Sequence, residues 1–180
     1  IETFSISDKK NTFIEAMELH VTDSLNLYVV TSNELYHYNI ALRKLNSVDK
    51  AFGAHSFMPL SNGFSLIATH QGLLFMQLNT DRIVNMISDE KFNNPLLNGL
   101  DLRKIKSDGY GNIWLATYTK GIYVIKSDGR VIKPKWDMIT HNYRVLDIQS
   151  YNNKIVIAID GFGLVSVPLL SCLYLYLQRP

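Results

Sequence analysis

Four segments of this chain repeat one pattern, and the spacing between them constrains the fold more than any other feature. Each has a polar turn, a five-residue largely apolar run, a short break, and a second apolar run. The first runs are Leu-Tyr-Val-Val-Thr at 27–31, Ser-Leu-Ile-Ala-Thr at 65–69, Ile-Trp-Leu-Ala-Thr at 113–117 and Ile-Val-Ile-Ala-Ile at 155–159. They end 38, 48 and 42 residues apart. That period is typical of four-stranded β-propeller blades, which span about 40–50 residues.

Each repeat also has room for the other strands of a blade. A first strand precedes each run, at 16–21, 57–60, 102–106 and 145–149, and an outer strand can follow at 44–48, 82–87 and 130–133. β-branched and aromatic residues fill the runs, and helical periodicity is not sustained for ten residues. The sequence therefore predicts an all-β fold of about four four-stranded antiparallel sheets. One propeller fragment covers 1–180, with repeats at approximately 13–50, 51–88, 100–133 and 142–177.

The number of repeats bears on how the blades are closed. Four is the lower end of the propeller range, so the chain forms either a small closed ring or an arc of a larger propeller, and we favour the arc. The terminal blades of an arc leave apolar faces uncovered, so we expect self-association through the first or fourth repeat. Trp114 is expected to fill the space between neighbouring blades, and Thr117 to close a hydrogen bond at its strand end.

Composition excludes several classes of protein. Apolar residues make up 47% of the 180 residues and charged residues 19%, so the chain is not disordered as a whole. A formal charge of +2 is unlike the basic surface of a nucleic-acid binder. One cysteine excludes an internal disulfide framework and a thiolate-rich zinc cluster. The uncharged stretch at 161–177 is interpreted either as strands, which its period-two alternation favours, or as part of a membrane segment.

The third repeat carries the most distinctive set of residues. It reads Asn-Gly-Leu at 98–100, an acidic turn at 107–108, Gly-Asn-Ile-Trp-Leu-Ala-Thr at 111–117 and Gly-Ile-Tyr-Val at 121–124. This pattern resembles the two-component regulator propeller repeat, and the other three repeats match it more loosely. The resemblance implies the extracytoplasmic sensor region of a membrane-anchored, often hybrid, histidine kinase of Bacteroidetes. Sensors of that family usually carry two seven-bladed propellers, which implies that this chain is one part of a longer protein.

No catalytic motif stands out in the sequence. The segment around Asp108 approaches an Asp-box, but sialidase chemistry needs a basic cluster, and the six arginines do not occupy matching blade positions. The five histidines form no close ligand pair, and neither His-Glu-x-x-His nor Gly-x-Ser-x-Gly occurs. Cys172 lies in an apolar tail without a basic setting. We therefore expect no enzymatic activity, no metal and no cofactor in this chain.

One loop face of the propeller is the expected ligand site, because two sets of loops converge there. One set joins the second strand of a blade to its third, and the other joins the last strand to the next blade. Saccharides are held by aromatic faces together with hydrogen-bonding side chains. The candidate residues in these loops are His70, Gln71, Asn93, Asn94, Tyr118, Lys120, Trp136, Tyr143 and Phe162.

The function implied by the resemblance is a non-catalytic ligand-sensing module that recognises an oligosaccharide and relays a signal to transcription. It would lie in the periplasmic or extracellular part of an inner-membrane protein. Expected partners are an oligosaccharide or another small ligand, the other blades or domains of the parent protein, and a second copy, but no nucleic acid. Two alternatives stay open: a protein-interaction scaffold without a small ligand, and a propeller glycosidase or lyase.

Overall fold

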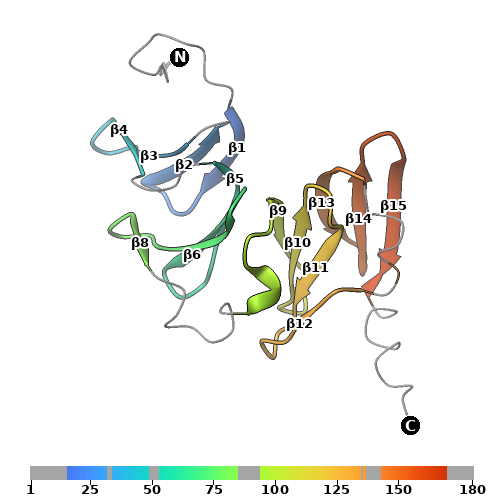
Figure 1. Cartoon of the computed structure of the whole chain (residues 1–180). Helices are drawn as coiled ribbons and strands as arrows, with labels where there is room; N and C mark the ends of the chain where they lie inside the picture. The colour runs from blue at the N-terminus through green and yellow to red at the C-terminus, as the bar shows by residue number, and fades with distance from the viewer. Residues whose placement is uncertain are drawn as a thin grey trace.

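The fold is built almost entirely from antiparallel strands. The structure is a computed structural model, and it describes residues 16–31, 34–48, 53–84, 94–134, 136 and 143–169. These residues form fifteen strands and one short 3₁₀ helix, η2 (Pro95–Leu97), arranged as successive sheets along the chain (Figure 1). The prediction of an all-β chain is confirmed.

The strands form four sheets, which we call blades I to IV, and within each sheet the strands follow one another in chain order. Blade I contains β1 (Ala16–Val21), β2 (Asn26–Thr31), β3 (Leu35–Asn39) and β4 (Lys44–Ser47). Blade II contains β5 (Ala54–Pro59), β6 (Phe64–Thr69), β7 (Gly72–Gln77) and β8 (Arg82–Val84). Blade III contains β9 (Leu102–Ser107), β10 (Ile113–Thr117), β11 (Ile122–Ile125) and β12 (Val131–Ile132). Blade IV has three strands among the described residues, β13 (Val145–Tyr151), β14 (Lys154–Ile159) and β15 (Gly163–Pro168).

Strand pairing places the four apolar runs at equivalent positions, as the spacing predicted. We call the first strand of each blade (β1, β5, β9 and β13) its inner strand. The last residue of each run pairs with the first residue of the inner strand of its blade: Thr31 with Ala16, Thr69 with Ala54, Thr117 with Leu102, and Ile159 with Val145. The Thr117 hydroxyl donates to the Gly121 carbonyl at 2.8 Å, which confirms the expected hydrogen bond at the strand end. Every residue of β10 is buried, because neighbouring blades cover both of its faces.

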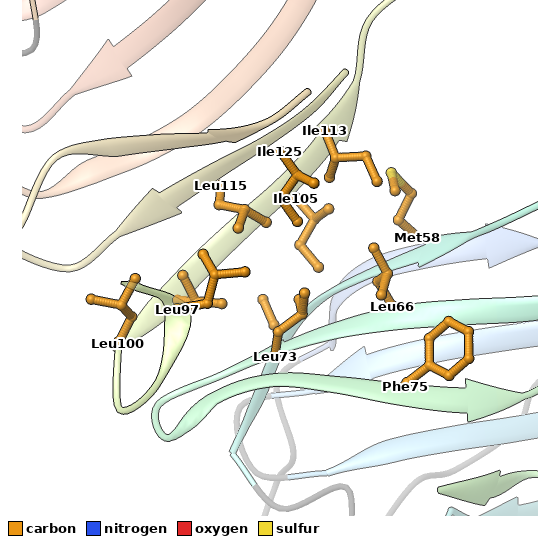
Figure 2. Close-up of a cluster of buried hydrophobic side chains, with 12 residues drawn as sticks. Met58, Leu66, Leu73, Phe75, Leu97, Leu100, Ile105, Ile113, Leu115 and Ile125 are labelled. Atoms are coloured by element: carbon orange, nitrogen blue, oxygen red, sulfur yellow. The ribbon is translucent and has the colours of Figure 1, made fainter. Parts of the chain in front are cut away.

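Three hydrophobic cores join the four blades, one at each junction. Figure 2 shows the core between blades II and III, where Leu66 and Leu73 meet Ile105 and Leu115. Trp114 is fully buried in the core between blades III and IV, and its indole N–H donates to Asp108 Oδ2 at 2.9 Å. This confirms that the ring fills the space between blades.

The two end blades expose apolar positions that the inner junctions bury. Leu19 of β1 is 65% exposed, whereas Phe57, Ile105 and Ile148 at the same position of the other inner strands are at most 5% exposed. Leu164 of β15 is 75% exposed, whereas its equivalents are also at most 5% exposed. Those equivalents are Leu35, Leu73 and Ile122. No hydrophobic core joins blade IV to blade I within the described ranges.

The stretch that raised the membrane question is partly described. Residues 163–168 form β15, which pairs with β14 along its whole length, and residues 170–177 lie outside the described part. No helix among the described residues is long and apolar enough to cross a bilayer. The strand expected at 2–6 also lies outside the described residues.

Candidate functional site

A central cavity lies between the innermost strands of the four blades. Its volume is about 470 Å³, and β1, β5, β9 and β13 all contribute to its wall. These strands form the inner edge of each sheet (Figure 1). The cavity wall mixes polar and apolar side chains, because successive residues of the inner strands alternate between the cores and the cavity. The charged lining residues are Glu18, Lys104, Lys106 and Asp147.

Glu18 links three blades on one side of this cavity. Its carboxylate accepts hydrogen bonds from the Lys104 ammonium at 2.5 Å, from the Ser56 hydroxyl at 3.2 Å and from the backbone N–H of Phe57 at 3.2 Å. His20 Nε2 lies 3.1 Å away. Burial by itself would raise the pKa of Glu18, but the hydrogen bonds from His20, Lys104 and Ser56, with the charge of Lys104, lower it to about 2.

Each inner strand has a β-bulge at its second residue. In β1, Ala16 pairs with Thr31 and Glu18 pairs with Val30, so one residue between them has no partner. The same irregularity occurs in the other three blades. A bulge re-aims the extra side chain and often lies next to a functional site. The bulged residues are Met17, His55, Arg103 and Leu146.

The bulged Arg103 belongs to a cationic cluster at the loop face, directly before the cavity-lining part of β9. Its guanidinium carbon lies 4.5 Å from the centre of the Tyr118 ring, and that of Arg144 lies 5.8 Å from the same ring. Arg103 Nη2 donates to Asp101 Oδ2 at 2.8 Å. The backbone N–H of Tyr118 donates to the Asp101 carbonyl at 2.8 Å, which fixes the ring beside both arginines. The cluster therefore joins blades III and IV.

Several enclosed polar atoms in this region have no hydrogen-bond partner among the residues that the structure describes. They are His55 Nδ1, Asp101 Oδ1 and Arg103 Nε. Buried polar atoms normally have a partner, either in the protein or in a bound water or ligand. Burial, followed by the charge of Arg103, lowers the pKa of His55. We call the set of His55, Asp101, Arg103, Tyr118 and Arg144 the cationic rim.

The histidine of the neighbouring turn packs against this rim from blade II. The His70 ring lies 6.5 Å from the His55 ring in an edge-on arrangement. Gly53 makes this approach possible, because a Cβ atom there would lie only 1.9 Å from His70 Nδ1. Gly53 also has φ +66°, a conformation that favours glycine.

The predicted site residues fall into two groups. Most lie in exposed turns of the expected loop face: His70 and Gln71 in the β6–β7 turn, Tyr118 and Lys120 in the β10–β11 turn, and Phe162 in the β14–β15 turn. The Tyr143 and Phe162 rings lie 5.8 Å apart, and Tyr143 immediately precedes Arg144 of the rim. These aromatic side chains are exposed, so they can meet a ligand.

The other predicted residues have structural roles or lie outside the described part. Trp136 stacks on Trp114, with ring centres 6.2 Å apart, and packs against the core of blades III and IV. Asn94 caps η2, where its side-chain oxygen accepts from the Leu96 N–H at 3.0 Å. Asn93 lies outside the described residues. The side-chain oxygen of Asn94 is thus used within the chain. The enclosed indole Nε1 of Trp136 has no hydrogen-bond partner among the described residues, so a ligand-contacting role of Trp136 stays a prediction.

Sequence reasoning missed four residues of the rim: His55, Asp101, Arg103 and Arg144. A signal for two of them was available, because aligning the repeats on their first strands places His55 and Arg103 at the same position. Arg144 precedes its strand, so its blade position differs from that of Arg103. Because of that difference, the sequence alignment of the repeats does not indicate that Arg103 and Arg144 both contact Tyr118.

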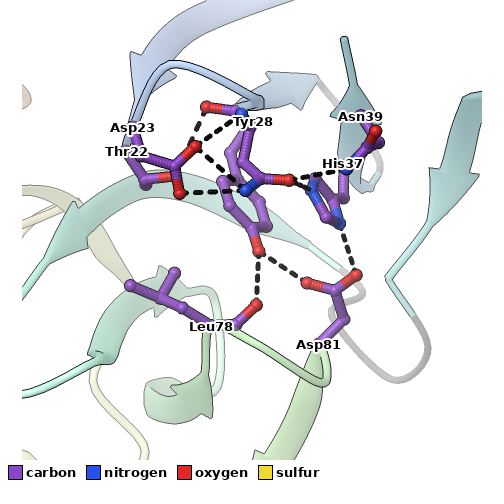
Figure 3. Close-up of polar contacts among 8 residues, drawn as sticks. Thr22, Asp23, Tyr28, His37, Asn39, Leu78 and Asp81 are labelled. Carbon is purple, nitrogen blue, oxygen red and sulfur yellow. Dashed lines mark hydrogen bonds and ion pairs between the residues drawn. The ribbon is translucent and has the colours of Figure 1, made fainter. Parts of the chain in front are cut away.

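The opposite loop face carries a second polar network, between blades I and II (Figure 3). The Tyr28 hydroxyl donates to Asp81 Oδ1 at 2.6 Å, and His37 Nδ1 lies 2.6 Å from Asp81 Oδ2. His37 Nε2 lies 2.8 Å from Asn26 Oδ1, and the Asn26 amide donates to both carboxylate oxygens of Asp23. The Tyr28 ring stacks on His37. Each of these side chains has a partner, so this network ties blades together.

No protein-family model matches the sequence, and no curated protein matches it. Solved structures match the fold. The extracellular domain of BT4673 from B. thetaiotaomicron, described as a one component system, aligns with a TM-score of 0.69 at 19% identity, over 94% of this chain and 23% of that chain. The extracellular domain of BT3049 from the same organism, described as a hybrid two component system, gives 0.59 at 17% identity, over 87% and 21%.

A computationally designed protein, Ika4, has a comparable likeness. It aligns with a TM-score of 0.60 at 9% identity, over 92% of this chain and 96% of that chain. Such likenesses concern the fold, and together with the four sheets they define this chain as a β-propeller of four blades. The chain spans less than a quarter of the two bacterial extracellular domains.

Proposed function

We propose that this chain is part of the extracellular sensor region of a two-component system and has no catalytic role of its own. The fold likeness to the extracellular domains of BT4673 and BT3049 supports this, as does the resemblance of the third repeat to the two-component regulator propeller. The proposal places the chain in the periplasmic or extracellular part of an inner-membrane protein. Kinase chemistry would belong to other parts of that protein.

The ligand of this proposal is an oligosaccharide at the loop face. The observation that carries it is the cationic rim with the Tyr143 and Phe162 rings beside it. Saccharides present apolar C–H faces and many hydroxyl groups, so exposed aromatic rings and uncommitted hydrogen-bonding atoms suit them. Binding would change the packing between domains or subunits, and that shift in populations would be the signal.

The partner of the end faces is proposed to be a second copy of this chain, packed head to tail. At each internal junction, one blade contributes Leu35 or its equivalent (Leu73 or Ile122). The next blade contributes Phe57 or its equivalent (Ile105 or Ile148). Among the described residues, one face of each kind is exposed, with Leu164 on blade IV and Leu19 on blade I. Because these faces are complementary in every internal junction, a second copy can repeat the same packing.

Binding measurements on a panel of neutral and acidic oligosaccharides test the sensor proposal. We expect one class of sugar to raise the melting temperature and to be recovered unchanged after incubation. Tyr143→Ala should weaken that binding by about tenfold, the effect of losing one aromatic contact of about 1.4 kcal/mol. Tyr151→Ala is the matched control, because Tyr151 is an exposed tyrosine on the opposite loop face.

Two results would overturn the sensor proposal. If no sugar binds while the end faces still associate with propeller blades, the chain is an interaction scaffold. If the sugar is converted to a product, the chain is an enzyme, a glycosidase or lyase.

A further inference from the structure

The described part of the cationic rim holds two guanidinium groups and one carboxylate, and the Lys120 ammonium lies in the neighbouring turn. Arg103 has one acidic partner, Asp101, through a single guanidinium nitrogen. The guanidinium of Arg144 contacts the Tyr118 ring and has no acidic partner within the described ranges. Lys120, in the same turn as Tyr118, contributes its backbone N–H to Thr117 Oγ1 and leaves its ammonium exposed.

The Tyr118 ring holds the guanidinium groups of Arg103 and Arg144 in place. A guanidinium that stacks on an aromatic ring is held in its plane while its N–H edges stay available. Two such groups converge on Tyr118 from different segments, Arg103 from β9 and Arg144 from the residue before β13. The two arginines would repel one another without the ring and without a counter-charge, and among the described side chains the Asp101 carboxylate is the one that bonds to either guanidinium.

A second observation points to the same deficit of negative charge. After burial, the charge of Arg103 contributes most to lowering the pKa of His55, and His70 and Lys104 lower it further. Asp101 opposes them only in part. The unpaired Arg103 Nε and His55 Nδ1 lie on the same side of the arc. Arg103 and Lys104 therefore place positive charge around His55.

We infer that the cationic rim binds the oxyanion of an acidic saccharide, a uronate carboxylate or a sulfate ester, between Arg103 and Arg144. Guanidinium groups bind carboxylate and sulfate oxygens through paired N–H bonds, which fix the position of the anion. The sugar ring next to the anion would then contact Tyr143 and Phe162, because Tyr143 adjoins Arg144 in the chain. This inference rests on the proposed sensor function and narrows its ligand to one chemical class.

Matched pairs of acidic and neutral sugars test this inference by calorimetry on the whole chain. The probes are tetragalacturonic acid with its carboxyl-reduced form, a sulfated galactan tetrasaccharide with its desulfated form, and inorganic sulfate. We expect at least one acidic sugar to bind about tenfold more tightly than its neutral form, a difference of about 1.4 kcal/mol. The first pair reports a carboxylate, and the second reports a sulfate ester.

Variants show whether the rim is responsible. Arg144→Gln should weaken the acidic sugar about tenfold, and the affinity should fall with added salt, because a charge-assisted contact is lost or screened. Arg144 is exposed, so its replacement leaves the cores intact. Lys154→Gln removes the same charge on the opposite loop face and should change the affinity less than about twofold.

Three results would overturn the inference. Equal binding of the neutral sugars, unaffected by Arg144→Gln, would remove the anion site and leave the sensor proposal standing. Inorganic sulfate that binds as tightly as the sugars would mean an adventitious ion only. No binding of any probe would overturn both the anion site and the sensor proposal.

Discussion

Replacing Glu18 by Gln is the perturbation that best tests how the blades are held together. Glu18 accepts hydrogen bonds from blades II and III, and Lys104 loses its counter-charge if the carboxylate is removed. A change of one pH unit in an acid's pKa is worth about 1.4 kcal/mol, so lowering the pKa from 4.5 to about 2 corresponds to about 3 kcal/mol of folding free energy. The amide should lose about that much at pH 7.

The pH dependence of this loss has a definite sign. Because the pKa of Glu18 is lower in the folded state, its stabilisation is fully present above about pH 4.5 and is lost as the pH falls from there to about 2. The difference in unfolding free energy between the natural chain and Glu18→Gln should therefore be largest near neutral pH and should shrink toward pH 3.

Urea unfolding followed by tryptophan fluorescence at pH 7, 5, 4 and 3 measures this difference. Glu34→Gln is the matched control, because the Glu34 carboxylate accepts an exposed hydrogen bond from Ser47 and its replacement should cost less than about 0.5 kcal/mol. A loss below about 1 kcal/mol at pH 7 would refute the reasoning. So would a loss that stays constant from pH 7 to pH 3, because ionisation of Glu18 would then contribute nothing.

Two further predictions concern the junctions between blades. Trp114→Ala should cost about 3–5 kcal/mol in a denaturant titration, because a buried ring and its hydrogen bond to Asp108 are removed; a cost below about 1 kcal/mol would mean that the ring is exposed in solution. Light scattering over a dilution series should show self-association of the natural chain, and Leu19→Lys or Leu164→Lys should reduce it. Such interfaces are populated at tens of micromolar, so a natural chain that stays monomeric there would contradict the head-to-tail packing.

Much of the fold could be predicted because the information is local. Runs such as Ile113–Thr117 are apolar along their whole length, since a strand covered on both faces needs no polar residues, and their spacing sets the blade period. The burial of Trp114 and the positions of the turns holding His70, Tyr118 and Phe162 follow from the same pattern. These features depend on residues close together in the chain.

The candidate site could be predicted only in part, because its defining contacts join residues far apart in the sequence. Glu18 meets Lys104 across 86 positions, and Arg144 reaches the Tyr118 ring from another blade. The bulge at Arg103 is a register shift, and the pattern of apolar residues in the sequence does not indicate where it occurs.

The sequence by itself determined the strands, the repeat and the blade period, because alternation and turn chemistry act within a few residues. Only the tertiary structure decided that Leu19 and Leu164 are exposed among the described residues, since equivalent apolar residues are buried or exposed according to whether a described neighbouring blade packs on them. It also decided which polar side chains share the loop face, because the bulges and the stacking of blades set their directions.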